Sequence, residues 1–111
     1  MAIIYHLISQ SQWDISKTQT QHEADSLADE GFIHCSENID QLIRVANRIY
    51  ANRSDMLALE VDTNLLTAPM IREASKSGEI YPHIYGPLNI NAIKAVSNLV
   101  VKDAQFINVK S

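Results

Sequence analysis

The sequence predicts an α+β fold, in which a split, mixed or mostly antiparallel sheet packs with one long helix and one or two short helices. Short stretches rich in β-branched and aromatic residues outnumber the helical patterns. Only residues 39–50 carry apolar side chains at the spacing of three and four that marks a long helix face. The regular alternation of strand and helix that is typical of a doubly wound sheet is missing. With 111 residues and no linker, we expect residues 1–111 to form one domain.

The chain opens with a predicted strand and a short helix. β-branched and aromatic residues dominate residues 2–8, and their alternation places Ile4, His6 and Ile8 on one face. Residues 12–17 are predicted to form the short helix, because the serines just before them offer side-chain caps.

The next segment is predicted to be mostly irregular. Residues 18–25 are polar and favour a loop, which contains His22. One helical turn can begin near Asp25 and end at Gly31, which accepts the left-handed conformation of a helix cap. Residues 32–35 then form a short strand.

The most clearly predicted helix covers residues 39–50. Acidic Asp40 lies in its first turn and Arg48 near its end, which suits the helix dipole. Ser36 lies at the junction between strand and helix, and we expect it to be the N-cap. The positive end of the helix would then favour an anion beside Ser36.

The second half of the chain is predicted to be mainly extended. Strands are expected over residues 56–62, 70–73 and 81–85, a helical turn over residues 89–93, and a terminal hairpin from residues 95–102 and 106–109. Turns are expected at residues 75–78 and at the Gly-Pro pair that follows residue 85.

Composition excludes several classes of protein. The formal net charge is −4, which argues against a general nucleic-acid binder. The single cysteine, Cys35, excludes an internal disulfide and fits a reducing compartment, most simply a bacterial-type cytoplasm. Three glycines are too few for a Walker loop or a Gly-x-Gly-x-x-Gly dinucleotide loop at the required spacing. No apolar run approaches the ~20 residues of a membrane helix, and no signal peptide is visible.

Three of the four histidines lie in short apolar strands. They are His6, His34 and His83. Histidine transfers protons near neutral pH and binds metals and phosphates, and within a strand it must find a hydrogen-bond partner. Each alone can be a satisfied core residue, but we expect at least two of the three to share a cleft.

Other candidate residues lie in residues 79–87, a segment that contains two prolines, and on the long helix. Alternation can align Glu79, Tyr81 and His83 on one face, and Tyr85 adds another aromatic wall. Aromatic rings with polar tips suit a small-molecule pocket, although an aromatic edge loop packed on the core has the same pattern. Arg48 is either part of a solvated helix face or a phosphate clamp near the same cleft.

Two blocks of sequence carry a resemblance that covers about residues 3–100. They are Gly31-Phe-Ile-His-Cys-Ser36 and Pro82-His-Ile-Tyr-Gly-Pro-Leu88, supported by shorter blocks around His6 and Arg48. In this order and spacing they resemble domain of unknown function 952, a family of small bacterial proteins. The resemblance implies an ADP-ribosyltransferase-like fold, with NAD lying between the halves of a split sheet.

The resemblance also implies roles for individual residues. His6 matches a histidine that contacts an NAD ribose, and His34 and Ser36 are candidates to shape the nicotinamide pocket. Glu79 or His83 would act at the bond that breaks. Glu79, the late glutamate, lies in neither a Glu-x-Glu nor a Gln-x-Glu motif, which sets this chain apart from typical transferases.

Three functions remain open from the sequence. The first is binding of NAD or a related small-molecule nucleotide, with possible transfer or hydrolysis of its ADP-ribosyl group. The second is a metal-assisted hydrolase that uses His6, His34 and His83, and the third is a non-catalytic ligand- or protein-binding module. For the first, the catalytic candidates are Glu79, His83 and His34, and the ligand-binding candidates are His6, Ser36, Arg48, Tyr81 and Tyr85.

Overall fold

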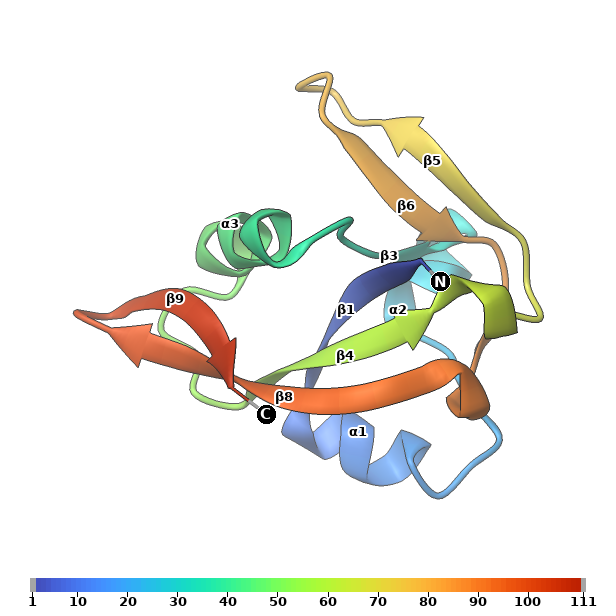
Figure 1. Ribbon diagram of the computed structural model, residues 1–111, viewed down its shortest axis with the longest axis horizontal. Coiled ribbons are helices and arrows are strands. Elements are labelled where there is room, and N and C mark those ends of the chain that lie inside the picture. Colours follow the sequence, from blue (N-terminus) through green and yellow to red (C-terminus); the bar gives the residue numbers. More distant parts are fainter. Residues whose placement is uncertain (1, 111) are drawn as a thin grey trace.

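The computed structural model describes residues 2–110, and strands are the dominant elements (Figure 1). The strands are β1 (Ile3–Ser9), β2 (Gln21–His22), β3 (Ile33–His34), β4 (Met56–Asp62), β5 (Met70–Ala74), β6 (Ile80–Ile84), β7 (Leu88–Asn89), β8 (Ile93–Lys102) and β9 (Gln105–Lys110). The helices are α1 (Gln10–Ser16), α2 (Asp25–Glu30) and α3 (Ile39–Ile49), with 3₁₀ turns η1 (Thr63–Leu65) and η2 (Ile90–Ala92).

The strands form separate antiparallel sheets. The largest has the order β1-β4-β8-β9, a second has the order β3-β6-β5, and β2 pairs with β7. In Figure 1 the β5–β6 hairpin stands apart from the four-stranded sheet. This arrangement confirms the predicted α+β class and the mostly antiparallel, divided sheet.

The core lies around β4, the strand between β1 and β8. Six of its seven residues are buried, including Leu57, Leu59 and Val61. Its nearly continuous apolar run fits a strand covered on both faces. Ile4 and Ile8 of β1 are buried in the same cluster, as the alternation of β1 predicted.

A single bridge connects β1 to the segment that follows β3. Tyr5 and Ser36 exchange both backbone hydrogen bonds, at 2.9 Å and 2.7 Å. The segment between β3 and α3 therefore crosses the free edge of β1. This crossing joins the two larger sheets and brings His34 close to His6.

The caps of α1 and α2 follow from local sequence. The Ser9 side chain accepts a hydrogen bond from the backbone N–H of Gln12, which begins α1. Gly31 ends α2 in the left-handed conformation, with φ of 87°, as predicted.

The predicted cap of α3 is wrong. Asn38, not Ser36, accepts the hydrogen bond from the backbone N–H of Gln41, at 2.8 Å. Ser36 cannot reach the helix, because its backbone is held in the bridge to Tyr5, and the helix begins three residues later at Ile39. Ser36 therefore does not belong to the N-terminus of α3, so the helix dipole gives no reason to expect an anion beside its side chain.

The remaining elements follow the predicted order. β8 and β9 form the terminal hairpin, whose turn residues Asp103 and Ala104 have φ of 53° and 64°. Asn47 of α3 bonds both the N–H and the carbonyl of Phe106, which fixes the helix against β9. Among the helices of residues 2–110, none has the length and apolar character to cross a membrane.

Candidate functional site

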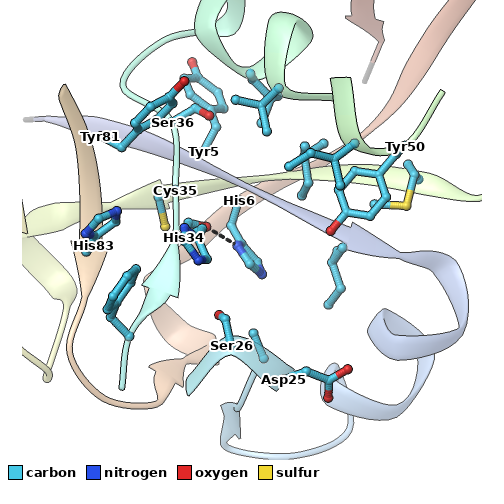
Figure 2. Close-up of a pocket in the computed structure, with 18 of the residues that line it drawn as sticks. Tyr5, His6, Asp25, Ser26, His34, Cys35, Ser36, Tyr50, Tyr81 and His83 are labelled. Carbon is cyan, nitrogen blue, oxygen red and sulfur yellow. Dashed lines mark hydrogen bonds between the residues drawn. The ribbon is translucent and has the colours of Figure 1, made fainter. Parts of the chain in front are cut away.

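A cavity of approximately 790 Å³ lies where β1, α2, α3, β3 and the β5–β6 hairpin meet (Figure 2). Small-molecule sites usually measure roughly 300–1,000 Å³. Its polar lining includes all four histidines, together with Tyr5, Asp25, Ser26, Glu30, Ser36, Arg48, Tyr50, Arg53, Lys76 and Tyr81. The cavity is therefore the natural place to test the predicted functional residues.

His6 presents a neutral hydrogen-bond acceptor to this cavity. Its Nδ1 lies 2.7 Å from the carbonyl oxygen of His34, which can only accept, so Nδ1 donates and Nε2 carries the lone pair. Burial lowers the pKa of His6 to about 4, although the hydrogen bond to His34 acts in the opposite direction. In Figure 2 the ring projects from β1 towards the space between His34 and Tyr50.

His22 is buried beside His6, so the prediction that it lies in a polar loop is wrong. β2 pairs with β7, which turns the side chain inward and leaves it 3% exposed. Its Nδ1 lies 2.7 Å from the Ser16 hydroxyl, and its ring centroid lies 5.5 Å from that of His6. Burial lowers the pKa of His22, with Asp25 and Glu23 opposing the shift. Its Nε2 has no hydrogen-bond partner within residues 2–110.

His34 and His83 face each other across neighbouring strands. They are directly paired in the register of β3 and β6, and their ring centroids are 5.4 Å apart. Each imidazole contacts its own carboxylate: His34 Nε2 lies 2.7 Å from Glu30, and His83 Nδ1 lies 2.9 Å from Glu73. The fold thus brings the three strand histidines to one cavity, and Figure 2 shows His83, His34 and His6 following one another across it.

The histidines do not form a metal site. Within residues 2–110, no group of three or more His, Cys, Asp or Glu side chains has a geometry that could hold a metal ion. His6 uses one nitrogen for a backbone carbonyl, while His34 and His83 are oriented by separate carboxylates. The donor set therefore does not fit the metal-assisted hydrolase that the sequence left open.

Cys35 and Ser36 are both buried, but they differ in what they can do. Cys35 is buried in the core, and burial raises the pKa of its thiol, which keeps the sulfur protonated and unreactive. Ser36 is 3% exposed and lines the cavity beside Tyr5 and Tyr81. Its side chain thus remains a candidate for ligand contact, although it caps no helix.

Glu79 and Tyr85 lie outside the lining of the cavity. Glu79 accepts hydrogen bonds from Gln41, Arg44 and Tyr81, and these bonds lower its pKa. The turn at residues 75–78 directs its carboxylate towards α3, so the predicted place for Glu79 at a reacting bond is not supported. Tyr85 instead donates to Glu73.

The two arginines Arg44 and Arg48 of α3 have different surroundings. Arg44 contacts Asp40 and Glu79, which ties it to the outer face. Arg48 lines the cavity and makes no hydrogen bond or ion pair with any residue in the range 2–110. Lys76 lines the cavity at the β5–β6 turn. Arg48 and Lys76 are thus available to an anionic ligand.

Sequence reasoning missed the partners that orient the histidines. Glu30 and Glu73 each bind one imidazole, and His22 adds a fourth ring. For Glu73 a signal was present: a turn at residues 75–78 folds the strand before it onto the strand that carries His83. For His22 there was none, because a two-residue strand in polar sequence has no periodicity.

The fold has counterparts among solved structures. The chain is similar to protein CC0527 from Caulobacter crescentus, whose crystal structure has a TM-score of 0.83 at 27% identity and covers 94% of this chain and 91% of that one. The solution NMR structure of CC0527 has a TM-score of 0.80 at 27% identity, covering 96% and 91%.

No curated protein matches the chain. The profile of a family described as protein of unknown function, DUF952, matches residues 7–96. That match covers most of the chain, including His6's neighbour Leu7, both histidine blocks and β4. The chain therefore belongs to the DUF952 family.

Proposed function

We propose that the cavity binds NAD or a related nucleotide, whose ADP-ribosyl group is the part that could be hydrolysed or transferred. The observation that carries the proposal is the neutral His6 acceptor in the lining of a cavity of approximately 790 Å³. A neutral imidazole with a free Nε2 can accept a hydrogen bond from a ligand hydroxyl without requiring a charge on the ligand. A ribose hydroxyl meets this requirement.

The cations at the cavity support an anionic part of the same ligand. The chain carries a net charge of −4, yet Arg48 and Lys76 lie at the cavity. A guanidinium that has no protein partner suits a phosphate, because it donates two parallel hydrogen bonds. A nucleotide whose diphosphate lies near Arg48 and whose ribose lies near His6 would bind both the guanidinium and the imidazole acceptor.

Titration of isotopically labelled protein with NAD, followed by amide NMR, tests the proposal. We expect shifts to be concentrated around His6, His34, Ser36 and Arg48, and saturable. His6→Asn is the sharpest variant, because an asparagine amide can replace the Nδ1–H donor to His34 while removing Nε2. It should weaken NAD binding about tenfold, the loss expected for one hydrogen bond.

A matched pair of arginines provides the control. Arg48→Gln should weaken binding and reduce its dependence on salt, whereas Arg44→Gln, one helical turn earlier and outside the cavity, should leave the affinity unchanged. A flat titration up to millimolar NAD, or equal effects of the two arginine variants, would refute nucleotide binding at this cavity.

A further inference from the structure

Tyr85, Glu73 and His83 form a hydrogen-bonded group that the nucleotide binding proposed above does not use. Tyr85 and His83 alternate on the same face of the chain, and both bond the same oxygen of Glu73 on β5. The two hydrogen bonds, that from Tyr85 first, lower the pKa of Glu73, so its carboxylate stays ionised. Tyr85 thus orients the carboxylate of Glu73, which in turn orients the imidazole of His83.

This group fixes the tautomer of His83. Because an ionised carboxylate only accepts, Nδ1 of His83 must carry the proton, and Nε2 carries the lone pair. Nε2 has no hydrogen-bond partner within residues 2–110, and it is not among the buried unpaired atoms. In the neutral ring, Nε2 is therefore an unpaired, accessible acceptor on a residue that lines the cavity.

Packing holds the ring of His83 in place. Phe32 stacks on it with ring centroids 4.0 Å apart and an interplanar angle of 22°. His83 lies on β6, the middle strand between β3 and β5, so both neighbours fix its backbone. A ring with a fixed tautomer and a fixed orientation is held ready to accept a proton from a group bound in the cavity.

We propose that His83 is the general base of a hydrolytic reaction in this cavity, with Glu73 and Tyr85 as positioning residues. The proposal rests on the nucleotide binding proposed above. Water bonds through its oxygen to the ribose carbon that carries nicotinamide, while one of its protons passes to Nε2 of His83. The carbon–nitrogen bond breaks with its electron pair going to the nicotinamide ring, so NAD and water become nicotinamide and ADP-ribose, and His83 returns its proton to solvent.

The distribution of charge favours a glycosidic carbon over phosphorus as the reacting atom. Phosphoryl transfer needs cations around the phosphate that moves, whereas opening of a glycosidic bond builds positive charge on carbon. The carboxylates of Glu30 and Glu73 accompany His34 and His83 and favour positive charge there. None of the ion pairs formed by these two carboxylates involves Lys or Arg in residues 2–110.

The test measures nicotinamide release from NAD in parallel with NAD binding. We expect slow turnover by the wild-type protein and a loss of about 10²-fold in His83→Gln, the usual contribution of a general base. Glu73→Gln should lower turnover about tenfold without changing NAD affinity, since it removes only the group that orients the base. Tyr85→Phe should have a smaller effect in the same direction.

A spectroscopic signature separates positioning from a structural role. Long-range proton–nitrogen NMR of His83 should show a protonated Nδ1 and an unprotonated Nε2 in the wild-type protein, and a mixture of tautomers in Glu73→Gln. Unchanged amide spectra elsewhere would show that the variants remain folded.

Glu79→Gln tests the rival assignment, because Glu79 also accepts a hydrogen bond from a tyrosine but lies outside the cavity. If Glu79→Gln abolishes turnover while Glu73→Gln does not, our assignment is wrong. NAD that binds but stays intact also overturns it, while leaving nucleotide binding established. NAD that does not bind refutes both proposals, and the titration identifies that case.

Discussion

At the scale of single residues, His6 couples protonation to folding. Its pKa falls from 6.5 in the unfolded chain to about 4 in the fold, because it is buried. The unfolded state therefore binds more protons between these values, so His6 contributes full stability above pH 6.5 and loses it as the pH falls towards 4. The shift corresponds to about 3 kcal/mol.

The prediction is tested by comparing wild-type protein with His6→Asn in urea unfolding at pH 7.5, 6, 5 and 4. We expect the difference in free energy of unfolding, wild type minus variant, to fall by about 3 kcal/mol from the highest to the lowest pH. His22 remains in both proteins, and burial, the main cause of its lowered pKa, acts in both. A constant difference across this range would show that His6 is not held neutral by burial.

The residue scale also shows how far sequence reasoning reaches. The placement of His6, His34 and His83 in strands was readable from their β-branched neighbours, and the structure brings all three to one cavity. Their states were not readable, because each depends on a distant partner: a carbonyl 28 residues away for His6, and Glu73 ten residues away for His83. Hydrogen-bond partners are properties of the fold rather than of the segment.

At the scale of elements, the local sequence of α3 predicts the extent of the helix but not its N-cap. The spacing of its apolar residues predicted the helix over residues 39–50, and it spans Ile39–Ile49. Its cap was misassigned because Ser36 and Asn38 are both good N-cap residues. The choice between them is made by the bridge between Tyr5 and Ser36, which no local pattern reveals.

This assignment of the cap predicts the effect of substitutions at Asn38. Asn38→Ala should lower the free energy of unfolding by about 1 kcal/mol, because the backbone N–H of Gln41 loses its acceptor. Asn38→Ser, which keeps a capping oxygen, should restore most of the loss. Urea unfolding of the two variants measures both effects, and equal stability of Asn38→Ala and wild type would contradict the assignment.

At the scale of the whole molecule, stability is centred on β4 and the cavity lies at its periphery. β4 is paired on both sides, and most of its residues are buried, as its continuous apolar run predicted. The cavity is bounded in part by α2, a helix of six residues that has no buried residue. Segments with few buried apolar contacts open at low free-energy cost, and binding sites are often built from them.

Amide hydrogen exchange should therefore divide the molecule into two parts. The paired amides of β4 should exchange only through global unfolding, with a protection that matches the free energy of unfolding from urea. The amides of α2, a helix of six residues without a side-chain N-cap, should exchange through local opening at least 100-fold faster than those of β4. Saturating NAD should slow exchange in α2 more than mass action on global unfolding accounts for, because ligand contact stabilises the closed form of the segment itself. Equal protection of α2 and β4 without ligand would mean that the cavity wall unfolds only with the core, and that ligand entry requires no local opening of α2.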